Sequence, residues 1–149
     1  MSQEGGEGCR LKRPRHDLKA WQEAMELARK VYTLVRDFPA EERYGLTAQI
    51  RRSAISVPSN IAEGCARGSA REFLQFPYIA RGSLSELETQ LRLAHDFGFC
   101  DAREVLSKIE ALFALFGGLI KSQRRHTDAL QAAKPPTDRS RKRPTCLTQ

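Results

Sequence analysis

The sequence predicts an all-α protein: an antiparallel, up-down-up-down four-helix bundle with disordered basic N- and C-terminal tails. Four segments of about 20–27 residues carry apolar residues at alternating steps of three and four, which places them on one side of a helix. The connections between these segments are short, so consecutive helices are expected to be antiparallel neighbours. No alternating apolar–polar run or hairpin signal predicts a strand.

The domain boundaries follow from composition. Residues 1–16 are rich in glycine and charge and have no helical periodicity, which predicts a disordered N-terminal tail. After Arg125 the chain becomes polar and then strongly basic, so residues 126–149 are predicted to be a disordered basic C-terminal tail. Residues 17–125 are therefore the predicted four-helix bundle, and the 149-residue chain is long enough for one packed domain but not two.

The first helix is predicted to begin at Asp17, which suits an N-cap, and to end at Phe38-Pro39. The residue before a proline is pushed out of the α region, which ends the helix there. Two adjoining apolar rows form a wide stripe that suits packing against two neighbouring helices. The rows are Leu18, Trp21, Met25, Ala28, Tyr32 and Val35, and Ala24, Leu27, Val31, Leu34 and Phe38.

The second helix is predicted to run from Ala40 to about Cys65, with Glu41 and Glu42 suited to its positively polarised N-terminus. Its apolar spacing stays in phase across Pro58, which predicts a kinked continuous helix rather than two separate ones. The apolar stripe is Leu46, Ile50, Ala54, Val57 and Ile61, and beside it lie Ser53, Ser56, Asn60 and Glu63. These small and polar residues predict that a neighbouring helix approaches closely.

The third helix is predicted to open with a capping box at Ser69–Glu72, in which the serine faces the Glu72 amide. Pro77 in its second turn predicts a kink, and Gly98 suits the C′ position that ends it. The sequence Asp101–Glu104 repeats the capping pattern and is expected to open the fourth helix. In that helix the adjacent Gly117-Gly118 costs roughly 1 kcal/mol of helix propensity per glycine, which predicts close packing there.

The net charge of +7 is carried by the two ends of the chain. Residues 1–16 and 121–149 together carry +8, whereas residues 17–120 carry −1. Inside the predicted bundle, the segment from Arg43 to Arg81 has six arginines and two acidic residues, a local charge of +4. A segregated arginine patch favours an anionic partner, although a solvated face balanced by acidic neighbours is equally compatible with it.

These arginines are the candidate nucleic-acid-binding residues, because a planar guanidinium donates two parallel hydrogen bonds to a phosphate. The set is Arg43, Arg51, Arg52, Arg67, Arg71 and Arg81. Trp21, Tyr32 and the phenylalanines lie in phase with the predicted core, so base stacking of the kind seen in RNA-recognition motifs is not expected. Binding to RNA or DNA should therefore be driven by phosphate contacts and fall steeply with salt.

A second candidate constellation is polar. Asn60 and Glu63 lie one turn apart on the second helix, and Ser83, Glu86 and Gln90 share a face of the third. Both sets border apolar stripes and could meet in the bundle. They could form a recognition surface or an inter-subunit pocket, or they could be a buried polar layer that fixes helix register, which is the favoured interpretation. A small-molecule site between subunits around Glu63 and Glu86 is a further, minor possibility.

No catalytic residue, metal site or cofactor is predicted. Neither His95 nor His126 has a glutamate three residues before it, as di-metal bundles require. The segment Gly64–Gly68 lacks the lysine and hydroxyl of a phosphate-binding P-loop. No serine or cysteine has a nearby histidine to act as its base. The sequence therefore favours a protein that is not an enzyme.

The expected compartment is the cytoplasm, without membrane attachment. No run of 18 or more apolar residues exists, and the N-terminus lacks the apolar segment of a secretory signal. The four cysteines, Cys9, Cys65, Cys100 and Cys146, lie far apart and form no CxxC pair. Reduced thiols in a cytosolic protein are the simplest interpretation.

The sequence resembles one protein family closely, over roughly residues 17–124. The resemblance rests on Phe38-Pro39, Glu42-x-Tyr44-Gly45-Leu46, Gln49-Ile50-Arg51-Arg52-Ser53-Ala54, Ser59-Asn60-Ile61-Ala62-Glu63-Gly64 and Ile79-Ala80-Arg81-Gly82-Ser83-Leu84-x-Glu86-Leu87-Glu88-Thr89-Gln90-Leu91. These motifs are similar to those of the bacterial four-helix bundle proteins encoded in intervening sequences of large-subunit rRNA genes. Pro77 departs from the family, which usually carries an ordinary helix former there.

The resemblance implies an antiparallel bundle commonly assembled as a homopentamer. It also implies a likeness in fold to the accessory proteins of diversity-generating retroelements, basic pentamers that bind a reverse transcriptase and nucleic acid. Two functions follow as hypotheses. The first is a non-enzymatic homo-oligomeric bundle that binds RNA or DNA through an arginine-rich face. The alternative is a protein–protein scaffold whose arginine face docks an acidic partner.

Overall fold

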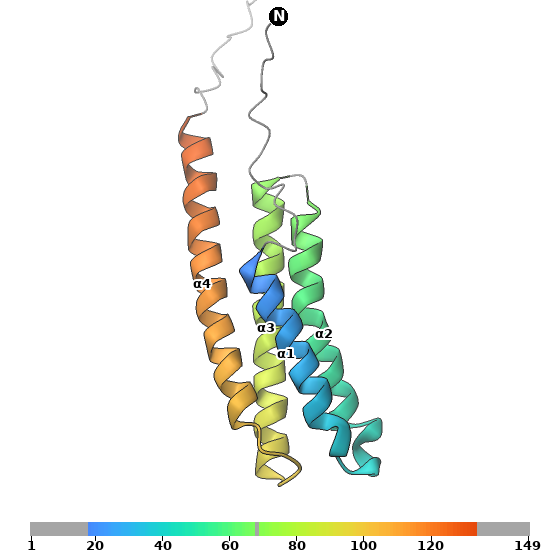
Figure 1. Cartoon of the computed structure of the whole chain (residues 1–149). Helices are drawn as coiled ribbons and strands as arrows, with labels where there is room; N and C mark the ends of the chain where they lie inside the picture. Colours follow the sequence, from blue (N-terminus) through green and yellow to red (C-terminus); the bar gives the residue numbers. More distant parts are fainter. Residues whose placement is uncertain (1–17, 68, 134–149) are drawn as a thin grey trace, which may run out of the picture.

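The computed structural model describes residues 18–67 and 69–133, and every regular element in those ranges is helical. The elements are α1 (Lys19–Leu34), the 3₁₀ turns η2 (Val35–Asp37) and η3 (Ala40–Arg43), α2 (Leu46–Cys65), α3 (Ala70–Asp96) and α4 (Arg103–Ala132). Consecutive helices run in opposite directions, and each packs against its two neighbours around the ring α1–α2–α3–α4 (Figure 1). The predicted all-α, up-down-up-down bundle is confirmed.

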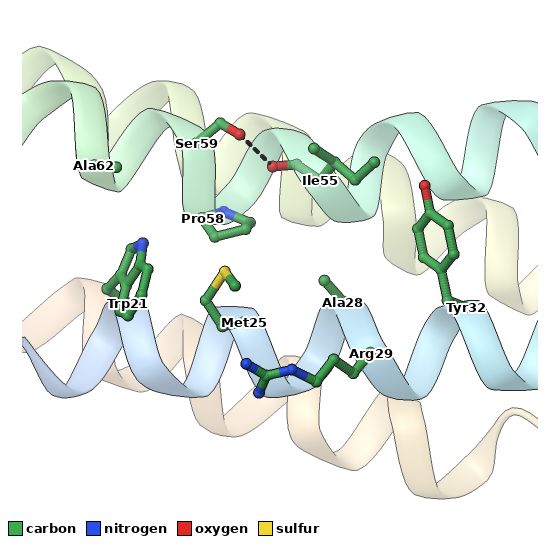
Figure 2. A pocket seen from close by; sticks show the side chains of 9 residues that line it. All are labelled: Trp21, Met25, Ala28, Arg29, Tyr32, Ile55, Pro58, Ser59 and Ala62. Atoms are coloured by element: carbon green, nitrogen blue, oxygen red, sulfur yellow. Dashed lines mark hydrogen bonds between the residues drawn. The ribbon is translucent and has the colours of Figure 1, made fainter. Parts of the chain in front are cut away.

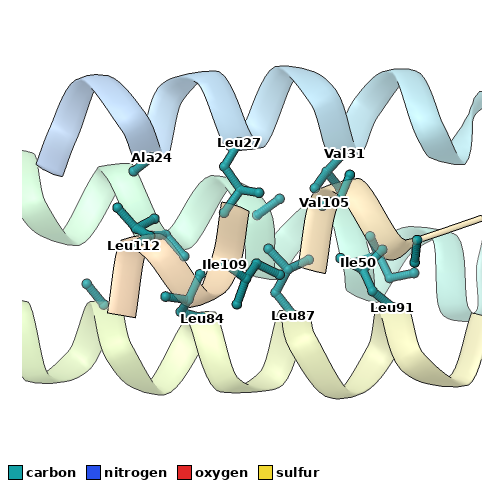
Figure 3. Packing of buried hydrophobic residues seen from close by; sticks show 14 of the residues in the cluster. Ala24, Leu27, Val31, Ile50, Leu84, Leu87, Leu91, Val105, Ile109 and Leu112 are labelled. Atoms are coloured by element: carbon teal, nitrogen blue, oxygen red, sulfur yellow. The ribbon is translucent and has the colours of Figure 1, made fainter. Parts of the chain in front are cut away.

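The core is built from one apolar row on each helix. Figure 3 shows side chains of the four rows meeting in a common interior, among them Leu27 of α1, Ile50 of α2, Leu87 of α3 and Ile109 of α4. These four side chains are fully buried. Because all four helices contribute branched aliphatic residues to the same interior, burying them stabilises the bundle as a unit.

The contact between α2 and α3 is the most extensive in the bundle. Gly64 near the end of α2 is buried, and a Cβ atom at that position would lie 2.7 Å from the Cβ atom of Phe76 on α3. Ser53 is also buried at this contact, and Ser56 and Ser83 share a hydrogen bond of 2.8 Å across it. The predicted close approach of a neighbour to the small residues of α2 is therefore observed.

The ends of α1 and α2 differ from the prediction. The α-helical part of α1 stops at Leu34 and continues as η2, and Phe38 before Pro39 is extended, as expected for a residue preceding proline. The predicted start of the second helix at Ala40 is wrong, because that segment is the separate turn η3 and α2 begins at Leu46. Gly45 has a non-helical conformation between the two.

Glu42 acts on the start of α2 from outside the helix. Its carboxylate accepts the Leu46 backbone N–H at 2.9 Å, which satisfies one of the donors that a helix N-terminus leaves unpaired. The prediction that Glu42 acts at the N-terminus of this helix is therefore confirmed, although Glu42 itself lies before the helix begins. From Leu46 onward α2 runs without interruption through the buried Pro58, as predicted.

Two of the three predicted terminal motifs of α3 and α4 are confirmed. The Glu72 backbone N–H donates to the Ser69 hydroxyl at 3.2 Å, and that hydroxyl donates to the Glu72 carboxylate at 3.0 Å. Gly98 has a positive φ of 76° after the end of α3. The N–H of Phe99 donates to the Ala94 carbonyl at 2.9 Å, which completes a Schellman-type ending.

The prediction of a second capping box at Asp101–Glu104 is wrong. The N-cap of α4 is Ala102, which makes no side-chain cap. Asp101 instead accepts the Arg103 backbone N–H at 3.1 Å and binds the guanidinium of the same residue. These hydrogen bonds hold the pKa of the Asp101 carboxyl well below its usual range.

Helix α4 is longer than predicted. It runs to Ala132, whereas a tail was expected from residue 126, because residues 126–132 include the good helix formers alanine, leucine and glutamine. The predicted N-terminal tail, Asp17 and residues 134–149 lie outside the described residues. The close packing predicted at Gly117-Gly118 is also wrong: both residues are exposed, and a Cβ added at either position would meet nothing within 4 Å.

We predict that Gly64→Ala destabilises the fold by about 1–3 kcal/mol, because the added methyl group must push Phe76, and with it α3, away from α2. Urea denaturation followed by circular dichroism measures this change. The matched control is Gly118→Ala, where space is open and the change should stabilise the helix by about 0.5–1 kcal/mol. Equal stability changes in the two variants would contradict the close α2–α3 contact.

Candidate functional site

The six candidate arginines do not gather on one face of the bundle. Arg51 of α2 lies over the Tyr32 ring of α1, with its Cζ atom 5.4 Å from the ring centroid. Arg81 of α3 instead borders a groove between α3 and α4. Because α1 and α3 are diagonal in the bundle, these two arginines point to different sides. The arginine-rich stretch of sequence is therefore not a single arginine-rich face.

Two of the six arginines have partners nearby in sequence. Arg67 donates to the Glu63 carboxylate at 2.6 Å, and its guanidinium lies 4.8 Å from the centroid of the Phe76 ring. Arg43 lies 5.9 Å from the ring centroid of its neighbour Tyr44. Arg52 and Arg71 are exposed. Of the set, Arg81 is the one that adjoins other cations across a groove.

We call this feature the cationic groove. It lies between α3 and α4, has a volume of about 360 Å³, and is lined by Tyr78, Arg81, Gly117, Ile120, Lys121, Arg124, Arg125 and Asp128. The α4 residues recur at steps of three and four, so they project from one side of that helix. Four cations and one carboxylate surround the groove, which gives it a positive potential suited to an anion.

The sequence prediction missed Lys121, Arg124 and Arg125 as site residues. They were counted with the basic C-terminal end, whereas the structure places them on α4. A signal was available: Lys121 and Arg124 follow Gly117 at i+4 and i+7, which puts them on one helix face. Linking that face to Arg81 requires the α3–α4 packing, which the sequence does not display.

A second groove, here called the apolar groove, lies between α1 and α2 (Figure 2). It has a volume of about 610 Å³ and is lined by Trp21, Met25, Ala28, Arg29, Tyr32, Ile55, Pro58, Ser59 and Ala62. The α1 row that borders it was predicted to be part of a wide buried stripe. In the structure this row lies at the edge of the core, with Tyr32 40% exposed, so one side of the stripe has no neighbouring helix.

The predicted polar constellation is only partly assembled. Within α2, Asn60 donates to the Ser56 carbonyl and hydroxyl at 2.9 and 3.0 Å, and the Ser56 hydroxyl shares a hydrogen bond of 2.8 Å with Ser83 of α3. The Ser53 hydroxyl approaches the Glu86 carboxylate at 3.4 Å. These groups form a half-buried polar seam within one chain, which is closer to the expected register-fixing layer than to a pocket.

The remaining two members of that constellation, Glu63 and Gln90, make no hydrogen bond to the seam in the described residues. Glu63 is exposed and pairs with Arg67 on its own helix. The Gln90 side-chain oxygen is buried and has no hydrogen-bond partner among the described residues. A shared site containing Glu63 and Glu86 is therefore not formed within one chain.

The described residues contain no group of histidine, cysteine, aspartate and glutamate side chains that could hold a metal ion. His95 is held by the loop after α3, with its Nδ1 atom 3.1 Å from the Cys100 carbonyl oxygen. Burial raises the pKa of the Cys100 thiol, which disfavours the reactive thiolate. Across the described ranges, none of the helices is both long and apolar enough to cross a bilayer.

The fold and its surfaces define an antiparallel four-helix bundle that carries the cationic groove and the apolar groove on its outside. Residues 16–119 match the family described as 23S rRNA-intervening sequence protein, and the chain belongs to that family. The chain is also similar to a crystal structure from Bacteroides thetaiotaomicron VPI-5482, of a protein with unknown function from the S23 ribosomal protein family.

That similarity has a TM-score of 0.62 at 20% sequence identity and covers 68% of this chain and 98% of the other. At this identity it supports the fold alone. None of the curated proteins compared matches the chain. The resemblance inferred from the motifs is thus confirmed at the level of family and fold.

We predict that the Glu63–Arg67 pair contributes only about 0.3–0.5 kcal/mol of coupling, because both side chains are about half exposed on one helix. A double-mutant cycle with Glu63→Ala and Arg67→Ala, measured by urea denaturation, gives this energy. A coupling of several kilocalories per mole would show that the pair belongs to a buried site.

Proposed function

We propose that the protein is a non-enzymatic, homo-oligomeric four-helix bundle that binds the phosphate backbone of RNA or DNA through the cationic groove. The observation that carries this proposal is the convergence of Arg81 from α3 with Lys121, Arg124 and Arg125 from α4 around one groove. Arginine and lysine are the side chains that neutralise backbone phosphates, and each such contact releases counterions from the nucleic acid.

The setting of these cations supports the proposal. Within the described residues, none of these four cations forms an ion pair with a carboxylate. The carboxylate that lines the groove with them is Asp128. Their charge is thus not neutralised within one chain to the extent that Arg67 or Arg92 is. Tyr78, 43% exposed beside them, offers a ring on which a base can stack.

Oligomerisation would strengthen such a site. One groove with four cations binds a phosphate backbone only modestly at physiological salt. Several copies held in one assembly convert later contacts into intramolecular events and raise the overall affinity. The homo-oligomer implied by the resemblance fits this requirement.

The alternative function is a protein–protein scaffold whose cations dock an acidic partner. The cationic groove accommodates carboxylates as well as phosphates, because a guanidinium pairs with both. Salt dependence discriminates between the two functions. Displacement of many counterions from a nucleic acid gives a steep log–log slope, whereas a compact protein interface responds less.

We predict that Lys121→Ala combined with Arg124→Ala weakens nucleic-acid binding and lowers the log–log salt slope by about 2 on duplex DNA, one phosphate contact per residue. Fluorescence anisotropy of the full-length protein with labelled RNA and DNA, single- and double-stranded, over a range of salt concentrations measures both effects.

The charge-matched control is Arg92→Ala combined with Arg103→Ala. Both residues are paired with carboxylates near the opposite end of the bundle, at the α3–α4 loop. This variant should keep the wild-type slope. Equal losses in the two variants would show that only net charge matters, and an absence of binding at low salt would refute the nucleic-acid function.

A further inference from the structure

We propose that the apolar groove between α1 and α2 receives the outer face of α3 from a second copy of the chain, in a head-to-tail contact. This inference rests on the homo-oligomeric part of the proposed function and names the two surfaces that make the assembly. It does not depend on nucleic-acid binding.

The apolar groove has the form of a receptor for a helix. On α1 its apolar residues recur at steps of four, three and four from Trp21 to Tyr32, and on α2 they run from Ile55 to Ala62 (Figure 2). The α1 row is about 17 Å long at the helical rise per residue. Two parallel apolar rows with a trough between them are the surface into which an amphipathic helix docks. Ile55 is 48% exposed, so this wall lacks a partner in one chain.

The charged groups at the edge of the apolar groove are positive. Arg29 lines it from α1, and Arg51 lies over Tyr32 at one end. The Nε atom of Arg51 is buried and has no hydrogen-bond acceptor within the described residues. Glu26 of α1 is turned the other way, where it pairs with Lys108 of α4 at 2.9 Å. The groove therefore suits a helix that carries apolar and acidic residues on one face.

The outer face of α3 is such a surface. Ile79, Glu86 and Leu93 follow one another at steps of seven residues and so lie along one side of the helix. This side borders the polar seam, where the exposed Glu86 carboxylate also accepts the Ser53 hydroxyl at 3.4 Å. Ile79 is 50% and Leu93 42% exposed. The row from Ile79 to Leu93 is about 21 Å long, similar to the groove. Gly82 lies within it, and the open space around Gly82 allows a partner to approach the α3 backbone closely.

One chain cannot bring these two surfaces together. The apolar groove opens between α1 and α2, and the α3 row lies on a helix that is diagonal to α1. Each copy therefore offers one receptor and one ligand surface to other copies. A contact between two different surfaces is heterologous, and repeating it closes a ring or extends a filament. The Glu86 carboxylate of one copy would then face Arg29 or Arg51 of the next.

The test uses two variants of the full-length chain that each destroy one surface at an exposed position. Ile55→Glu places a charge in the apolar groove, and Ile79→Arg places one on the α3 row. Light scattering coupled to size-exclusion chromatography should show an oligomer for the wild type and a monomer for each variant. An equimolar mixture should form a one-to-one heterodimer, because one variant keeps its α3 row and the other keeps its groove.

Leu130→Glu is the matched control, since Leu130 is 57% exposed on α4 and belongs to neither surface. It should leave the oligomer unchanged, and circular dichroism should show the same helix content in all three variants. Variants that remain oligomeric, or a mixture that remains monomeric, would overturn the head-to-tail contact. The head-to-tail contact would also be overturned if the wild type were monomeric and bound an acidic amphipathic peptide in the apolar groove. That result would assign the groove to a different protein partner.

Failure of this inference can be distinguished from failure of the proposed nucleic-acid function. A wild-type monomer that binds RNA or DNA with a steep salt slope would refute the contact and leave the nucleic-acid function standing. A wild-type oligomer that dissociates as predicted in both variants but binds no nucleic acid would support the contact and refute that function.

Discussion

The close contact between α2 and α3 is the constraint on which the other features of the bundle depend. Gly64 against Phe76, with Ser56 bonded to Ser83 across the same contact, brings these two helices together more extensively than any other pair. A bundle with one tight pair cannot close equally on all sides. The α1–α4 contact is the least extensive of the four neighbour contacts. The apolar groove lies at the α1–α2 contact and the cationic groove at the α3–α4 contact, both of which are less extensive than the α2–α3 contact.

The two grooves differ in their lining: one is lined by cations and the other mainly by apolar side chains. The cationic groove is formed where α4 extends along the first half of α3, so Lys121 and Arg124 lie beside Arg81. The apolar groove is formed where α1 covers α2 with only one of its two apolar rows, which leaves Met25 of α1 opposite Pro58 of α2 across a trough (Figure 2). We propose that the cationic groove binds phosphate and that the apolar groove joins copies of the chain.

The sequence was sufficient for features set by local chemistry. Helical spacing identified the four helices, and the Ser69 cap and the Gly98 ending were found because each depends on residues within one turn. The failures concern three helix ends and the packing between helices. Gly117 was expected at a tight contact, but it lies on an exposed part of α4, and the spacing alone does not distinguish the two settings.

The candidate site shows the same limit more strongly. Arg51 and Arg81 belong to different helices, α2 and α3, so the packing of those helices decides which side of the bundle each arginine faces, and spacing within one helix does not. The cationic groove joins residues some forty positions apart, and it becomes visible only when α3 and α4 are placed side by side. At the start of α4, the sequence pattern predicted that the Asp101 carboxylate caps the helix. In the structure the guanidinium of Arg103 binds this carboxylate, and the N-cap is Ala102.

The measurement that tests the central claim most directly is hydrogen–deuterium exchange of the full-length protein with and without a single-stranded RNA. We predict that RNA slows amide exchange along α3 around Tyr78 and Arg81 and along α4 from Gly117 to Asp128. The α1–α2 face should be unchanged by RNA in the assembled protein. Protection confined to the α1–α2 face, or to residues outside 18–133, would contradict the assignment of the cationic groove as the phosphate-binding surface.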